Sequence, residues 1–289
     1  MRGGFGGKGG SISSRSIGKQ DVSDRASNSE NLIRSIAGGD LALWLDANDI
    51  TGIAEAGQIS SWTAKHGNNA PQSNSDYQPT YRGSGFNGRP SVRFDGTDDH
   101  FQYSAAGIQS TNQMENTIIS VSRHNDATSG GVVLELGAAF WASDGISQQY
   151  APAVPGTASL QLSGIGQDPG NDPQIISNEK LESELNVLIS TFDRNTNPDT
   201  VVNYLNAVSG SDPVVNTIAD TTGATNWNGL TTQIGCRRNP TPSLPLDGDI
   251  RELVVINRAV TKGEAFRLGK AFMERSGITK PFGSYTKYS

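Results

Sequence analysis

The acidic residues of this chain lack the spacing that sugar hydrolysis requires. Glycoside hydrolysis uses two carboxylates that flank the scissile bond, and alternate residues of one strand place both on one face. The sequence contains no Glu-x-Asp-x-x-Glu string, and Glu179, Glu182 and Glu184 cluster in a polar stretch typical of a solvated loop. Glu135 and Glu252 lie inside predicted strands and are the remaining candidates. We therefore predict no catalytic residues and no enzymatic activity.

Nucleophilic catalysis has no support either. His66, His100 and His124 are scattered singly, without a serine or cysteine motif nearby. Cys236 is the one cysteine, so the chain forms no internal disulfide. Two arginines follow it and could lower the pKa of its thiol, but no partner residue accompanies it. We interpret it as a small strand residue.

A weak metal-binding pattern follows one predicted strand. Asp95, Asp98 and Asp99 supply three carboxylates within five residues, and calcium prefers oxygen ligands from loops. The alternative is a structural turn, in which Asp95 accepts hydrogen bonds from backbone amides and Gly96 adopts positive φ. The sequence favours the turn, leaves calcium as an alternative, and indicates no other cofactor.

Aromatic residues in polar loops are the candidates for glycan binding, because sugars stack on exposed aromatic rings beside hydrogen-bonding side chains. Trp141 and Tyr150 flank a polar, Gly/Pro-rich region, and Trp227 lies in a second such loop. The alternative for all three is ordinary surface or edge packing. Trp44 and Trp62 lie in apolar strand patterns and are predicted to be core residues.

Composition limits the classes of partner. The net charge is −6 and the isoelectric point is near 5.1, so nucleic acid is an unexpected partner. No run approaches the roughly 18 apolar residues of a membrane span, and the first residues lack the apolar segment of a signal peptide. We expect no membrane insertion. The 34 glycines and 13 prolines favour many short strands joined by turns.

Alternating apolar residues place these strands along the chain. The hairpin Asn186–Asp193 and Thr200–Val208 is joined by a polar, proline-containing turn. Residues Gly248–Asn257 alternate imperfectly, which predicts a strand that is buried on both faces or bulged. The other main predicted strands are Leu41–Leu45, Ser91–Phe94, Thr117–Ser122, Gly131–Leu136 and Thr231–Cys236.

One helix is predicted near the C-terminus. Thr261 and Glu264 form a capping-box pair, and Gly277 provides the stop. An apolar stripe lies between them, formed by Ala265, Leu268 and Phe272.

Residues 1–39 read as an extended arm, because they are rich in Gly and Ser and poor in apolar side chains. Phe5, Ile12 and Ile17 are isolated apolar residues that could anchor this arm on a partner, and the alternative is a disordered tail. Residues Glu30–Ile36 have helical spacing for one or two turns. We divide the chain into a docking arm (1–39), one compact domain (40–278) and a tail (279–289).

Three stretches of the compact domain resemble a known family. They are LALWLDANDITG with GQISSWTAKHGN and QPTYRGSGFNGRPSVRFDGTDDHF, then NVLISTFDRN with VVNYLNAV, and finally LDGDIRELVVINRAVTKGEAFRLGKAFMERSGI. Together they resemble concanavalin A-like, laminin-G-like jelly rolls of phage and bacterial surface proteins. Ala207 stands where the family usually has glycine, and residues Phe140–Ile176 have no counterpart.

This resemblance implies an all-β fold: a two-sheet antiparallel jelly-roll sandwich with one C-terminal α-helix and an extended N-terminal arm. Members of the family use a concave face to bind glycans or proteins, sometimes with calcium, and a few hydrolyse glycosides. Fold does not choose among these functions.

For function, we expect a virion structural protein of a tailed phage, made in the host cytoplasm and localised to the virion. Its arm would dock on other virion proteins, and its sandwich would serve as a tail-fibre or appendage domain that contacts host-surface glycans. A homo-oligomer, with a trimer favoured, follows from the resemblance and from the avidity of several linked arms. The alternatives are a capsid decoration protein, a carbohydrate-active enzyme and a non-viral carbohydrate-binding module.

Overall fold

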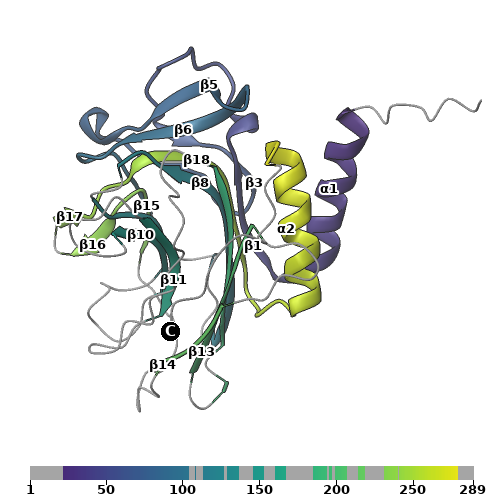
Figure 1. Ribbon diagram of the computed structural model, residues 1–289. Helices are drawn as coiled ribbons and strands as arrows, with labels where there is room; N and C mark the ends of the chain where they lie inside the picture. The colour runs from purple at the N-terminus through teal and green to yellow at the C-terminus, as the bar shows by residue number, and fades with distance from the viewer. Residues whose placement is uncertain are drawn as a thin grey trace, which may run out of the picture.

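The computed structural model describes residues 22–103, 108, 113–126, 129–136, 146–152, 160–166, 185–193, 195–196, 199–206, 214–218, 231–239 and 241–278. Two antiparallel sheets and a layer of helices make up this part of the chain (Figure 1). The predicted all-β sandwich is therefore confirmed.

The first sheet contains nine strands among the described residues. Its main path runs through β14 (Val214–Ile218), β13 (Asp199–Leu205), β12 (Asn186–Asp193), β8 (Glu115–His124), β18 (Asp247–Ile256), β1 (Leu41–Asp46) and β3 (Ala64–His66). The hairpin β5 (Thr80–Phe86) and β6 (Arg89–Asp95) joins this path where β6 pairs with β18. The predicted β12–β13 hairpin is also confirmed, with Leu188 opposite Leu205.

The second sheet has five strands among the described residues, in the order β11 (Leu160–Gly166), β10 (Ile146–Pro152), β9 (Gly131–Leu136), β15 (Thr232–Ile234) and β7 (Phe101–Tyr103). Two short pairs complete the strands: β2 (Ser61–Trp62) with β4 (Ala70–Pro71), and β16 (Arg237–Asn239) with β17 (Thr241–Ser243). Single 3₁₀ turns occur at η1 (Gly38–Asp40), η2 (Ala47–Asp49) and η3 (Ser75–Tyr77).

The space between the sheets is filled by one apolar core. Its aromatic centre contains Phe101, whose ring centroid lies 6.1 Å from that of Trp62 and 6.1 Å from that of Phe94. One buried amide joins the two layers, because Gln148 of β10 donates from Nε2 to the carbonyl of Ile118 at 2.9 Å. Trp62 is fully buried, which confirms its predicted core position. It alternates with the exposed Ser61 in β2, as the period of a strand requires.

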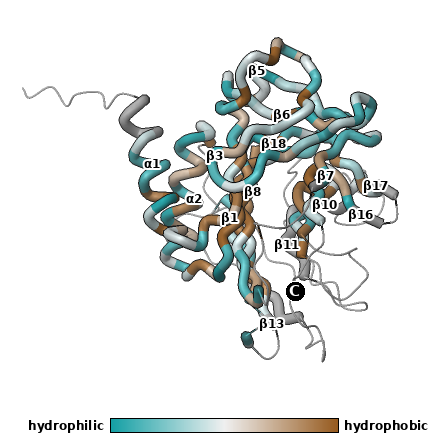
Figure 2. Tube along the Cα trace, turned by 180° about the vertical axis from the view of Figure 1, so that it is seen from behind, coloured by the Kyte–Doolittle hydropathy of each residue, from teal (hydrophilic) through white to brown (hydrophobic). Residues whose placement is uncertain are grey.

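A second apolar core lies on the opposite face of the first sheet, under two helices. Helix α2 (Lys262–Ser276) begins at the predicted capping box of Thr261 and Glu264 and ends at Gly277, whose φ is +69°. Its apolar stripe packs with Trp44, which is fully buried as predicted. Figure 2 shows hydrophobic residues gathered in the strands between the helices and the second sheet.

Helix α1 (Val22–Ala37) corrects the predicted arm. The sequence indicated one or two turns from Glu30, whereas the helix has 16 residues and belongs to the folded domain. Ile33 and Ile36 are buried in the second core beside α2 and the first sheet. Apolar residues at helical spacing gain a buried face only when a partner surface exists, and α2 with β1 supplies it. The arm anchors Phe5, Ile12 and Ile17 and the tail 279–289 lie outside the described residues.

Candidate functional site

A β-bulge in β18 places charged side chains on the helix-covered face of the first sheet. The register between β18 and β8 shifts between Ile250 and Glu252, so Arg251 is an extra residue in this strand. Ile250 and Leu253 both belong to the core between the sheets, whereas Glu252 contacts Trp44 on the other face. The bulge thereby directs two consecutive charged side chains toward the helices, and it confirms the predicted irregularity of this strand.

Two buried carboxylates share one guanidinium group at this point. Asp46 and Glu252 are opposite each other on β1 and β18, and both are at most 1% exposed. Nη2 of Arg275, from α2, lies 2.8 Å from Asp46 Oδ2 and 3.1 Å from Glu252 Oε1. Trp44 Nε1 also donates to Glu252 Oε1, at 2.9 Å. The arginine ties the last turn of α2 to the sheet.

Burial raises the pKa of Glu252 to about 7, and the neighbouring carboxylate of Asp46 adds to this effect. The cations Arg275 and Arg251 and the indole of Trp44 act in the opposite direction. The Glu252 carboxyl therefore titrates near neutral pH, because desolvation outweighs its favourable partners.

A second set of ion pairs attaches α1 to the same face. Lys65 Nζ lies 3.3 Å from Glu30 Oε2 on α1 and 3.4 Å from Asp49 Oδ2. Burial by itself lowers the pKa of Lys65, but the carboxylates of Asp46, Asp49 and Glu30 outweigh it and raise the pKa. Arg34 Nη2 adds a pair with Glu30 Oε1 at 3.0 Å. These ion pairs thus connect α1 to Lys65 of β3 and, through Lys65, to Asp49.

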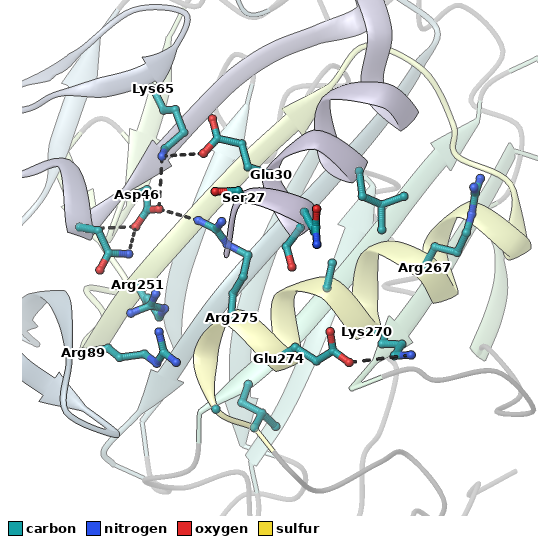
Figure 3. Close-up of a pocket in the computed structure, with 17 residues that line it drawn as sticks. Ser27, Glu30, Asp46, Lys65, Arg89, Arg251, Arg267, Lys270, Glu274 and Arg275 are labelled. Atoms are coloured by element: carbon teal, nitrogen blue, oxygen red, sulfur yellow. Dashed lines mark hydrogen bonds and ion pairs between the residues drawn. The ribbon is translucent and has the colours of Figure 1, made fainter. Parts of the chain in front are cut away.

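A cleft of about 990 Å³ opens between α1, α2 and the first sheet (Figure 3). Its walls carry six cationic and three acidic side chains among the described residues, together with amides, hydroxyls and a few apolar groups. The cations are Lys65, Arg89, Arg251, Arg267, Lys270 and Arg275, and the acids are Glu30, Asp46 and Glu274. The volume is at the upper end of the range typical of small-ligand sites.

Tyr150, one of the predicted glycan-binding aromatics, does not line this cleft. Tyr150 was predicted as an exposed platform, and this is wrong because its side chain is 1% exposed. It points inward from β10, its hydroxyl lies 3.0 Å from Ser122 Oγ, and burial raises its pKa. Trp141 and Trp227 lie outside the described residues.

The predicted acidic cluster is a hydrogen-bonded turn. Carboxylate oxygens of Asp95, Asp98 and Asp99 lie within 4.8 Å of one another. Asp95 Oδ1 accepts from the backbone N of Thr97 at 2.8 Å, Asp99 Oδ2 accepts from the backbone N of Asp95 at 3.0 Å, and Gly96 has φ +80°. Burial, followed by the charge of Asp95, raises the pKa of Asp99 to about 7. The predicted turn is confirmed, and calcium binding stays a prediction.

Glu135 and Cys236, two further candidates from the sequence, are buried and do not line the cleft. Glu135 lies on β9 of the second sheet, so it does not face Glu252 of the first. Cys236 is fully buried, and burial together with the charge of Glu135 raises the pKa of its thiol to about 12. A thiol with this pKa is protonated at neutral pH, which agrees with its interpretation as an inert residue.

Sequence reasoning missed the cleft, although it left two signals. Arg251 and Glu252 interrupt an apolar strand, and Arg275 lies in the last turn of an amphipathic helix. Charged residues at such positions are rarely buried without partners. The sequence does not say that β1, β3, β6, β18 and both helices bring those partners together.

No protein-family model matches the sequence, and no curated protein sequence matches it. Solved structures with a similar fold include a sialidase of Trypanosoma rangeli in complex with sialic acid, with a TM-score of 0.52 at 14% identity over 88% of this chain and 39% of the sialidase. The K499G mutant of NanB sialidase from Streptococcus pneumoniae has a TM-score of 0.44 at 14% identity, over 61% of this chain and 27% of that one.

The CBM40 domain of a Ruminococcus gnavus IT-sialidase, bound to alpha2,6 sialyllactose, has a TM-score of 0.44 at 14% identity and covers 62% of this chain and 96% of its own. At these identities the likeness to the T. rangeli sialidase concerns the β-sandwich fold alone. This chain spans about a quarter of NanB and about two fifths of the T. rangeli sialidase. The virion assignment of the sequence stays a prediction.

Proposed function

We propose that this protein is a non-catalytic carbohydrate-binding module that holds sugar in the cleft between α1, α2 and the first sheet. The observation that carries this proposal is the composition of the cleft. Carboxylates, amides and cations converge on it and can each bond to sugar hydroxyls, while Leu32, Ala271 and Ile278 offer apolar contact to a sugar ring. The shared fold with a sialidase solved with sialic acid guides the choice of sugars to test.

The buried carboxylates support binding without cleavage. Hydrolysis needs two carboxylates with a glycosidic bond between them. Asp46 and Glu252 instead hold the same Arg275 guanidinium, and both carboxylates are almost fully buried. A sugar bond has no room between them while Arg275 is in place.

The biological setting belongs to the same proposal in two forms. A non-viral carbohydrate-binding module needs nothing beyond the folded domain. The phage appendage predicted from the sequence needs, in addition, an arm that docks on the virion, and its anchors lie outside the described residues. The cleft serves either form, so binding of sugar is the property to test first.

The test is a panel of neutral and acidic oligosaccharides titrated calorimetrically against the full chain, with a variant that obstructs the cleft. Asn28 is exposed on α1 and lines the cleft, so Asn28→Trp should weaken binding at least about tenfold. Asn31→Trp is the matched control, because Asn31 is exposed on the same helix outside the cleft.

The proposal predicts that bound sugar is recovered intact, without release of reducing ends. It fails if no sugar in the panel binds, or if the two tryptophan variants weaken binding equally. If the protein released reducing sugar, and the folded Glu252→Gln variant did not, the protein would be an enzyme and the proposed non-catalytic function would be wrong.

A further inference from the structure

Two arginines at one end of the cleft lack the acidic partners that Lys65, Lys270 and Arg275 have. Arg89 begins β6 and Arg251 occupies the bulge of β18, and these strands pair with each other at Val92 and Ile250. Figure 3 shows the two guanidinium groups next to each other. Each also contributes to the walls of the cleft.

Three of the four other cations of the cleft wall show the contrast, and the fourth, Arg267, is exposed on α2. Lys65 and Arg275 each contact at least two carboxylates, and Lys270 Nζ lies 3.8 Å from Glu274 Oε1. In the described part of the chain, no carboxylate forms an ion pair with Arg89 or Arg251.

Arg251 carries its charge in an unfavourable place. It is 1% exposed, its Nε has no hydrogen-bond partner among the described residues, and its Nη1 reaches the carbonyl of Pro90 only at 3.5 Å. Burial lowers its pKa, and Arg89 and Arg275 add to this effect against the opposing charges of Glu252 and Asp46. A buried guanidinium with this little compensation costs stability unless a bound anion supplies the missing partner.

We propose that the ligand of the cleft is an acidic sugar whose carboxylate binds between Arg89 and Arg251. This inference rests on the proposed carbohydrate-binding function and names the class of sugar. A planar guanidinium offers two parallel N–H donors that match the two oxygens of a carboxylate. Glu274, exposed on the same walls, can accept hydrogen bonds from sugar hydroxyls, and its charge disfavours a polyanion.

The experiment compares sugars that differ in the acid group. Trigalacturonate is titrated against its methyl ester, and sialyllactose against lactose, with the full chain at physiological salt. We expect each acidic sugar to bind at least about tenfold tighter than its neutral counterpart. Arg89→Gln should weaken binding of the acidic sugars at least about tenfold and so remove this preference. Arg82→Gln is the control, because Arg82 is an arginine of β5 outside the cleft.

A second variant has a readout that loss of folding cannot imitate. Arg251→Met removes the uncompensated charge and retains an unbranched side chain, so the free protein should keep or raise its melting temperature. Binding of the acidic sugars should nevertheless fall at least about tenfold.

The outcomes separate this inference from the function it rests on. Equal binding of acidic and neutral sugars would leave the sugar site standing and refute the carboxylate site. Tighter binding of a sulfated oligosaccharide than of trigalacturonate and sialyllactose would also refute it. Absence of all sugar binding would refute the proposed function, and this inference with it. A lower melting temperature of Arg251→Met without ligand would refute the carboxylate site, because the arginine would then stabilise the fold itself.

Discussion

The two faces of the first sheet are both buried, but they are covered by different kinds of side chain. The face toward the second sheet is covered by an apolar core in which Gln148 is a polar bridge. The face toward α1 and α2 is apolar around Trp44, Val254 and Ile256, but it becomes charged at the bulge of β18. Apolar side chains can cover a sheet without the desolvation cost of buried charges, so charges on a buried face need a separate explanation.

On the helix-covered face of β18, apolar packing changes to charged residues at the bulge. From Leu253 to Ile256, alternate residues of β18 enter one core or the other, as a strand buried on both faces requires. At Arg251 and Glu252 the extra residue directs two charges to the helix side. The sandwich face therefore serves stability, whereas the helix face combines stability with the cleft.

The largest expected effect tests whether the charged part of the helix face holds the fold together. Arg275→Ala leaves two buried carboxylates without their shared cation, so the free energy of unfolding should fall by about 4 kcal/mol. Urea denaturation followed by circular dichroism measures this change. Lys270→Ala on the same helix removes an exposed pair and should cost about 0.5 kcal/mol or less. Equal losses in the two variants would contradict the distinction between the network and the surface.

A somewhat smaller effect compares the apolar parts of the two faces directly. Leu253→Ala opens a cavity toward the second sheet, and Ile256→Ala opens one toward the helices. Each should cost about 3 kcal/mol of unfolding free energy, because both side chains are fully buried. The same denaturation experiment applies to both. A loss below about 1 kcal/mol for Ile256→Ala would mean that the helix layer is not a packed core.

The smallest effect concerns pH and isolates Glu252. Its pKa is raised from 4.5 to about 7, so the folded protein binds more protons than the unfolded chain between these values, and stability falls as pH rises. The contribution of this group should decline by about 2 kcal/mol between pH 5.5 and 8, and Glu252→Gln should remove that decline. Asp99 acts in the same direction, whereas the lowered pKa of His124 acts oppositely below pH 6.5.

The difference between the parent and variant profiles of melting temperature cancels the contributions of Asp99 and His124. Parallel profiles would show that Glu252 does not titrate in this range. The comparison also bears on the proposed function, which depends on Arg275 being held by two carboxylates. If Glu252 were protonated, Asp46 would be the one charged carboxylate of this set that still pairs with Arg275.

Local patterns predicted most of the fold. Alternation placed the strands, the capping box of Thr261 with Glu264 placed the start of α2, and the broken alternation after Ile250 indicated the bulge. These features depend on neighbours a few residues apart, so the sequence displays them directly. Helix α1 was underestimated because its burial depends on α2, which lies at the other end of the chain.

The site could not be predicted in the same way. Exposed aromatics were the expected signal for sugar, yet Tyr150 alternates into the core from β10. The arginines of the cleft come from β6, β18 and α2, and nothing in their local sequence indicates that they converge.

The sequence by itself determined the all-β class, the C-terminal helix, the FDG turn at Asp95 and the irregularity of β18, because each follows from short-range periodicity or turn chemistry. The tertiary structure alone decided which charges are neutralised. Whether a buried arginine has a carboxylate within reach depends on strand register and helix packing across the whole chain. That is why Arg275 meets Asp46 and Glu252, while Arg251, one residue from Glu252, is left facing Arg89.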